Sequence, residues 1–181
     1  SGSLKDYYDE VSYTGLVVSP ANESQGTSND GIVHVTLGTA HPNMGSTWST
    51  AATTANTVMT AANSSVDYAS FDTNSDGTVS AWELAVVIIL AGYEKAFSTD
   101  TPNVWGHAYA TSVTLDGKAL GEYTMFGERH STHQATIGIM CHEYGHHALG
   151  LPDLYDTDNS SAGIGEWGLM GSGNWNQTGA N

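Results

Sequence analysis

The segment from Met140 to Asp153 constrains this chain of 181 residues more than any other stretch. His142 and His146 are separated by one helical turn, so on a helix both imidazoles point to the same face and can bind one metal ion. Glu143 follows the first histidine and can take a proton from a metal-bound water without occupying a coordination position. The pattern predicts a zinc-binding helix equipped to hydrolyse an amide bond. A surface helix that carries these residues by chance is the alternative.

Two residues predict where this helix ends and how the chain continues. Gly150 suits the left-handed turn after a helix, and Pro152 prevents the helix from continuing. The chain then returns with Asp153, whose carboxylate can complete a three-ligand zinc site with an open fourth position. Glu166 is an alternative third ligand, and His147 is a weaker one because it points to a different face of the helix.

A glycine-rich segment from Gly165 to Trp175 is the next landmark. Glycines on both sides of Leu169 and Met170 suit a tight turn, which can place Met170 beneath the metal as an apolar floor. A methionine in such a segment is otherwise an ordinary core residue.

A second metal site is predicted between Asp72 and Glu83, which match the calcium loop of an EF-hand. Gly77 permits the sharp turn of such a loop. The expected calcium ligands are Asp72, Asn74, Asp76, Thr78 through its carbonyl, and Glu83. A plain turn without metal is the alternative. The apolar run 85–91 predicts a buried strand in place of a second EF-hand helix, so we expect a calcium loop that stabilises the sheet.

The remaining periodicities predict a mixed α/β (α+β) domain. Apolar residues at intervals of three and four predict helices at 4–12 and 46–63. Alternation predicts strands at 15–19, 32–38, 103–114 and 120–126, with a hairpin at Asp116–Gly117 between the last two. One of those two strands is expected to border the cleft and to pair with an extended substrate. Residues 128–133, with Glu128, Arg129, His130 and His133, are interpreted as an exposed polar loop, and the alternative is that these side chains line the cleft.

Three stretches resemble the M6 metallopeptidases, which are related to immune inhibitor A and to the metzincin zinc endopeptidases. These are HEYGH with GLPDLYD at 142–156, EWGLMGSGNW at 166–175, and DYYDEVSY at 6–13. The resemblance implies a zincin-like catalytic domain with a mixed twisted sheet, an active-site HExxH helix and a Met-turn. It implies that His142, His146 and Asp153 bind zinc, that Glu143 is the general base, and that Met170 lies under the metal. Gly150 and Asp153 each fall one residue later than in the usual spacing, which rotates the helix exit by about 100° and leaves the third ligand open.

Composition limits the partners. Four basic residues stand against 19 acidic ones, for a net charge of −15, which argues against nucleic acids and anionic membranes. No apolar run is long enough for membrane insertion. Cys141 is the lone cysteine, so an internal disulfide is impossible, and we interpret it as a small buried hydrophobe.

Together these features predict a secreted zinc-dependent endopeptidase, with residues 1–181 as a single catalytic domain, Zn²⁺ and Ca²⁺ as cofactors, and proteins or peptides as substrates. Tyr155 is a candidate donor to the oxyanion. Further oxygens at Asp156 and Asp158 leave a second calcium site open. The alternatives are a catalytically inactive calcium- and zinc-binding module, a fragment of a larger protease truncated at both ends, and a zinc hydrolase acting on another substrate class. Cleavage preference and oligomeric state are not predicted.

Overall fold

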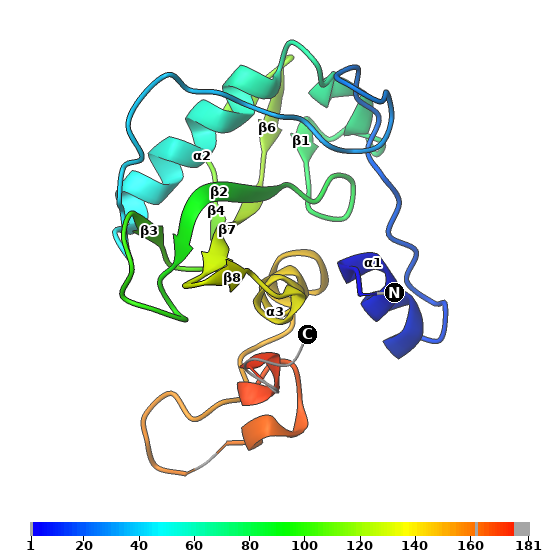
Figure 1. Cartoon of the computed structure of the whole chain (residues 1–181). Coiled ribbons are helices and arrows are strands. Elements are labelled where there is room, and N and C mark those ends of the chain that lie inside the picture. The colour runs from blue at the N-terminus through cyan, green and yellow to red at the C-terminus, as the bar shows by residue number, and fades with distance from the viewer. Residues whose placement is uncertain (1, 162, 176–181) are drawn as a thin grey trace.

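The computed structural model describes residues 2–161 and 163–175 (Figure 1). Its three α-helices are α1 (Leu4–Val11), α2 (Trp48–Ala62) and α3 (Ile137–Leu149). Three short 3₁₀ helices are η1 (Tyr68–Phe71), η2 (Gly165–Trp167) and η3 (Ser172–Trp175). The helices predicted at 4–12 and 46–63 are confirmed within two residues at each end. Within the described residues, no helix is long and apolar enough to cross a membrane.

The larger sheet is mixed, in the strand order β3-β2-β7-β4, with β8 added to one end of β7. Its strands are β2 (Val87–Glu94), β3 (Asn103–Val104), β4 (His107–Ala110), β7 (Glu122–His130) and β8 (His133–Gln134). The pairs β2–β3 and β2–β7 are parallel, whereas β4–β7 and β7–β8 are antiparallel. The predicted mixed α/β architecture is therefore confirmed, and β4 is an edge strand of this sheet.

The smaller sheet has the order β1-β6-β5 and contains the predicted hairpin. Its strands are β1 (Thr78–Val79), β5 (Thr114–Leu115) and β6 (Lys118–Leu120). Asp116 and Gly117 link β5 to β6 with φ angles of 50° and 78°. Two successive positive φ angles match the twist of a hairpin, which is why Asp-Gly is favoured there.

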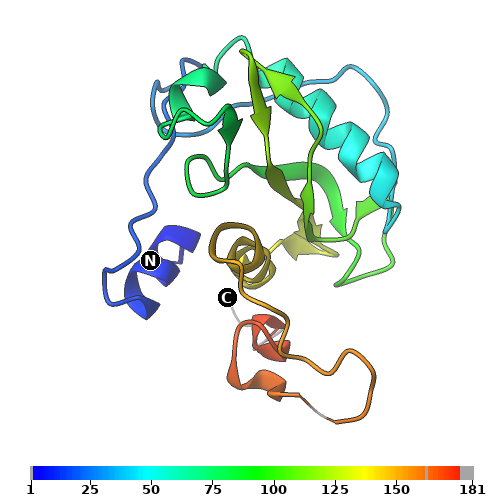
Figure 2. The same cartoon turned by 180° about the vertical axis from the view of Figure 1, so that it is seen from behind.

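Helices pack on both faces of the larger sheet, with α2 on one side and α3 on the other (Figures 1 and 2). The core under α2 joins Ala51, Ala55 and Met59 to Tyr123 and Met125 of β7. A second core joins Tyr8 of α1 to Cys141, Tyr144 and Ala148 of α3. The expectation that Cys141 is a buried hydrophobe is confirmed, since the residue is 1% exposed.

Two predicted strands, 15–19 and 32–38, are not formed. Residues 33–38 instead form irregular chain that borders a cavity of about 720 Å³, which also borders residues 86–91. In β2, only Tyr93 and Glu94 pair with β3. The segment 33–38 borders the same cavity as the rest of β2 but forms no β-ladder with it. The strand prediction from the alternating pattern was therefore wrong here, because a strand also requires a hydrogen-bonded neighbour.

Three other predictions need correction. The strand expected at 85–91 forms at Val87–Glu94, and it is not fully buried because Ile89 is 56% exposed. The strand expected at 103–114 is broken into β3, β4 and β5. Residues 128–133 are not a polar loop, since they contain the end of β7 and the start of β8, and His130 is buried and stacked on Phe97.

Candidate metal centre

Helix α3 carries the HExxH segment and ends as its sequence predicts. Gly150 adopts a left-handed conformation with φ of 63°. Its N–H donates to the carbonyl of His146, and the N–H of Leu151 donates to the carbonyl of Gly145, both at 3.1 Å. These bonds satisfy carbonyls that the last helical turn would leave free, and they reverse the chain direction. Residues beyond Leu151 therefore return toward the helix.

Three side chains converge at this reversal. The Nε2 atoms of His142 and His146 lie 3.1 Å apart, and each lies 3.1 Å from Oδ1 of Asp153. Ligands held about 2.0–2.1 Å from a tetrahedral zinc ion are separated by about 3.3 Å. The triangle is therefore close to the size that one zinc ion requires. Among the described residues, this is the one group of three metal-capable side chains with converging ligand atoms.

Hydrogen bonds on the far side of each ring orient the two histidines. Nδ1 of His142 lies 2.9 Å from the carbonyl oxygen of Leu169, and Nδ1 of His146 lies 2.6 Å from that of Leu151. A carbonyl only accepts, so each Nδ1 carries a proton, and Nε2 is the ring nitrogen that faces the candidate metal position. Both rings are thus held in the orientation that coordination through Nε2 needs.

Glu143 lies beside the triangle without belonging to it, and its side chain is largely buried. Burial raises the pKa of its carboxyl to about 7. The charge of His146 and a hydrogen bond from the backbone N–H of Ala108 lower this pKa, but burial has the larger effect. The charges of Asp153 and Glu94 add smaller increases. A carboxyl with a pKa near neutrality can both take up and release a proton at physiological pH.

The other candidate ligands lie elsewhere. Glu166 is in η2 and is not part of the converging group. His147 is buried and directs Nδ1 toward Oε2 of Glu122 at 3.4 Å. The structure therefore brings Asp153, not Glu166 or His147, to the two imidazoles.

Met170 packs against α3 at Gly145. A Cβ atom on Gly145 would lie 2.9 Å from its Sδ and 3.1 Å from the hydroxyl of Tyr8. The N–H of Leu154 donates to the Met170 carbonyl at 2.7 Å. Met170 is 6% exposed, so the segment that supplies the Leu169 carbonyl to His142 is held tightly under the helix.

Tyr155 lies on the open side of the group, with 45% of its surface exposed. Its hydroxyl donates to Oδ2 of Asp153 at 3.0 Å. Burial and this hydrogen bond raise its pKa, so the phenol keeps its proton as a donor. The arrangement leaves Oδ1 of Asp153 for the two histidines.

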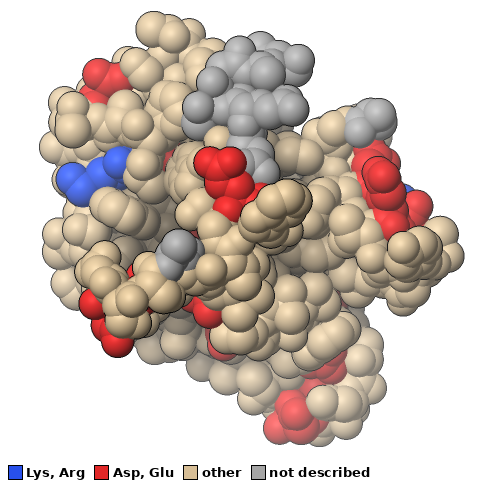
Figure 3. Space-filling view, turned by 90° about the horizontal axis from the view of Figure 1, so that it is seen from below, with Lys and Arg blue, Asp and Glu red and all other residues tan. Residues whose placement is uncertain are grey.

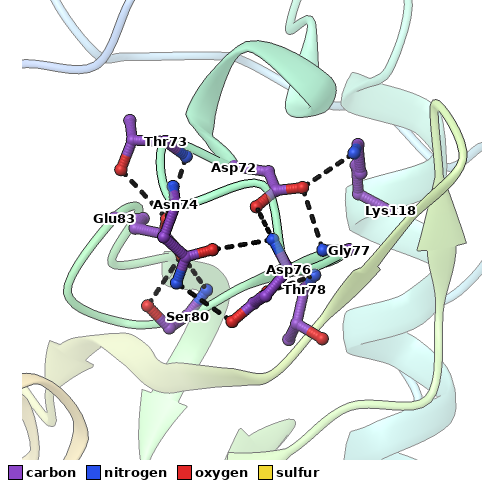
Figure 4. A network of polar contacts seen from close by, with 9 residues as sticks. All are labelled: Asp72, Thr73, Asn74, Asp76, Gly77, Thr78, Ser80, Glu83 and Lys118. Atoms are coloured by element: carbon purple, nitrogen blue, oxygen red, sulfur yellow. Dashed lines mark hydrogen bonds and ion pairs between the residues drawn. The ribbon is translucent and has the colours of Figure 1, made fainter.

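The predicted calcium loop folds around its own backbone (Figure 4). Oδ1 of Asp72 accepts from the N–H of Asp76, and Oε1 of Glu83 accepts from the N–H of Thr73 at 2.9 Å. Gly77 has φ of 90°, which fits the sharp turn predicted for it. The five expected ligands are Asp72, Asn74, Asp76, Thr78 and Glu83, and their carboxylates do not form a converging group of the kind seen at His142.

One basic side chain, missed in the sequence, reaches this loop. Nζ of Lys118 lies 2.7 Å from Oδ2 of Asp72, and the carboxylate is fully enclosed. The hydrogen bond from Lys118 is the largest cause of the lowered pKa of Asp72. Backbone and hydroxyl hydrogen bonds from Ser80 likewise lower the pKa of Glu83 to about 2. Both carboxylates therefore stay ionised at neutral pH.

Among the charged side chains on the face seen from below, acidic ones outnumber basic ones (Figure 3). A metal-capable triangle formed by α3 and the segment just after it, packed against a mixed sheet, is the arrangement expected of a metallopeptidase domain, and the comparisons with known proteins agree. The family model described as the immune inhibitor A peptidase M6 catalytic domain matches residues 2–181. The chain belongs to the M6 peptidase family.

Two curated relatives share part of this domain. The pre-pro-metalloprotease PrtV of Vibrio cholerae is 32% identical over 83 residues, which cover 40% of this chain and 9% of PrtV. Immune inhibitor A of Bacillus thuringiensis subsp. alesti is 31% identical over 83 residues, which cover 40% of this chain and 12% of that protein. The match thus spans about a tenth of the length of these relatives.

Proposed function

We propose that the protein is a secreted zinc-dependent endopeptidase whose catalytic domain comprises residues 1–181, with Glu143 as the general base. The observation that carries this proposal is the triangle of His142, His146 and Asp153, with sides of 3.1 Å, next to a buried carboxylate. Secretion is proposed from the family resemblance, and peptides are proposed as substrates because the chain is an M6 peptidase.

The chain offers three candidate ligands of the types that zinc prefers, two imidazoles and a carboxylate. Zinc bound there would lower the pKa of a coordinated water and polarise the scissile carbonyl. Nδ1 bonds to Leu169 and Leu151 hold the imidazoles in place. We assign Met170 the role of apolar floor, because its sulfur packs against Gly145 between the two ligand histidines.

Glu143 would take the proton from the attacking water and deliver it to the leaving amine. Burial raises its pKa in the metal-free protein, which opposes the lowering that a bound dication would cause. The phenol of Tyr155, which donates to Asp153, would donate to the oxyanion as charge develops on the substrate carbonyl.

Strand β4 is the proposed docking edge for an extended substrate. It lies at the end of the strand order and pairs only with β7 among the described strands. Ala108 of this strand already bonds to Glu143, so a peptide added alongside β4 would pass directly over the base. Main-chain pairing of this kind binds many sequences and gives little side-chain selectivity.

We also propose that Ca²⁺ binds the loop 72–83 through Asp72, Asn74, Asp76, Thr78 and Glu83. The three carboxylates of this twelve-residue loop support the proposal. Asp72 would have to exchange its ion pair with the Lys118 ammonium for the metal. Binding would require Glu83 to exchange its bonds to Thr73 and Ser80 for the metal. Calcium would then brace the connection from η1 to β1.

The variant Glu143→Gln tests the function. It is expected to bind one equivalent of zinc but to lose casein hydrolysis by at least about 100-fold, as for removal of a general base. Glu128→Gln, an exposed change in β7, is the matched control and should keep full activity. Casein turnover by Glu143→Gln would refute the assigned role.

The parent protein separates the remaining alternatives. Zinc binding without hydrolysis of any protein would favour an inactive binding module. Hydrolysis of non-peptide esters or glycans alone would favour another class of zinc hydrolase. Loss of casein hydrolysis on treatment with phenanthroline, with recovery on adding zinc, is the result that the proposal requires.

A further inference from the structure

Glu94, the last residue of β2, is a buried carboxylate with no part in the metal triangle. Its side chain is fully enclosed. Oε1 accepts from the backbone N–H of Gly106 at 2.7 Å and of Ala96 at 3.0 Å, and Oε2 accepts from that of Gly127 at 3.2 Å. An ionised carboxylate is costly to bury unless it is well hydrogen-bonded. A feature this costly, at the junction of three segments, requires an explanation.

The three donors belong to parts of the sheet that are far apart in sequence. Ala96 follows β2, Gly127 lies in the middle of β7, and Gly106 immediately precedes β4. Both glycines are needed for the close approach. A Cβ on Gly106 would lie 3.0 Å from Ile139 of α3 and 3.1 Å from Oε2 of Glu94, and a Cβ on Gly127 would overlap the backbone of Tyr93.

The position of Gly106 connects this carboxylate to the proposed chemistry. Gly106 is two residues before Ala108, whose N–H donates to the carboxylate of Glu143. Strand β4 is short and is paired on one side by β7, through His107–Met125 and Ala108–Thr124. Its beginning therefore depends on Gly106, and Gly106 depends on Glu94.

We propose that Glu94 is a positioning residue that fixes the start of β4 against α3, so that the Ala108 amide holds Glu143 in its working orientation. This inference rests on the proposed function of Glu143. Glu94 touches neither substrate nor metal in this scheme. In this role it acts through the backbone of Gly106 and β4; its charge also raises the pKa of Glu143, an effect that Glu94→Asp keeps and Glu94→Gln removes.

A carboxylate suits this role because it only accepts hydrogen bonds. Glutamine has nearly the same shape, but its NH₂ group would face at least one of the three N–H donors. The variant Glu94→Gln therefore loses one acceptor and directs a donor at Gly106 or Gly127. Glu94→Asp keeps two accepting oxygens on a shorter arm, so it should perturb β4 in the same direction but less.

The experiment compares zinc-loaded parent, Glu94→Gln, Glu94→Asp and the exposed control Glu128→Gln. Active sites are titrated with a hydroxamate inhibitor, and kcat and KM are measured per titrated site. Exchange of the Ala108 amide is followed by NMR. For Glu94→Gln we expect kcat to fall by about tenfold, as for a slightly misplaced catalytic group, with KM changed by less than about twofold and faster Ala108 exchange. Glu94→Asp should show a smaller loss of the same kind.

A purely structural role would lower the number of titratable sites but leave kcat per site and Ala108 exchange at the parent values, which would overturn the inference. If Glu94→Gln does not fold, the decision passes to Glu94→Asp, and parent values for that variant overturn the inference equally. A parent protein without zinc-dependent hydrolysis would refute the proposed function instead. Ala108 exchange then decides separately whether Glu94 positions β4.

Discussion

The raised pKa of Glu143 makes the stability of the metal-free protein depend on pH in a direction that can be worked out. Burial raises this pKa from 4.5 to about 7. Between those two values the folded state binds a proton that the unfolded state has released. The free energy of unfolding therefore falls as pH rises through this window. At about 1.36 kcal/mol for each pH unit, the destabilisation reaches about 3 kcal/mol above pH 7.

Glu143→Gln removes this dependence because an amide stays neutral at every pH. We therefore compare the free energies of unfolding of the two proteins at each pH. The value for the variant minus the value for the parent should rise by about 3 kcal/mol in total between about pH 4 and pH 8. Urea denaturation of EDTA-treated proteins across this range measures it. Other titrating groups are present in both proteins, so their contributions largely cancel. Glu128→Gln, at an exposed position, should give a difference that does not vary with pH.

Zinc should reduce the effect, because a nearby dication stabilises the ionised carboxylate and lowers its pKa. The rise in the difference should therefore be smaller for zinc-loaded proteins. A difference between Glu143→Gln and parent that is constant with pH, or that falls as pH rises, would show that burial does not control the protonation of Glu143.

Three other perturbations have expected outcomes. Asp153→Ala should weaken zinc binding at least about tenfold in competition with a chelator, whereas Glu166→Ala should not; the reverse result would make Glu166 the third ligand. Calcium should raise the thermal midpoint of the parent but not of Asp76→Ala, and an equal rise in both would place calcium elsewhere. Gly145→Ala gains about 1 kcal/mol of helix propensity but overpacks Met170 and Tyr8 at about 1–3 kcal/mol. Urea denaturation should show net destabilisation, and a more stable variant would contradict the packing argument.

The parts of the fold that the sequence predicts best are those determined by local interactions. Helix α3 ends at Gly150 because glycine adopts the left-handed conformation without a steric penalty. The hairpin forms at Asp116–Gly117 for the same kind of reason. Helix α2 is rich in threonine, an unfavourable choice for a helix, yet Thr53, Thr54 and Thr57 each bond to the carbonyl four residues earlier.

The parts that the sequence does not predict depend on partners distant in the chain. Residues 32–38 alternate like a strand, but their neighbour does not pair with them. Lys118 is an ordinary surface lysine in the sequence and becomes the partner of Asp72, 46 residues earlier, only in the folded protein. Glu94 likewise has no motif, since its three donors are backbone groups of residues that share no pattern.

The metal centre combines both situations. Its side chains follow a readable spacing, but the groups that orient them are the carbonyls of Leu151 and Leu169 and the amide of Ala108. Backbone groups are the same for every residue type, so these positions carry no chemical signature in the sequence. Changing the leucine side chains should matter less than moving their backbone. Gly106 and Gly145 leave no room for a Cβ atom beside Glu94 and Met170. At these two positions, an added methyl group would therefore displace groups that support the site without being ligands.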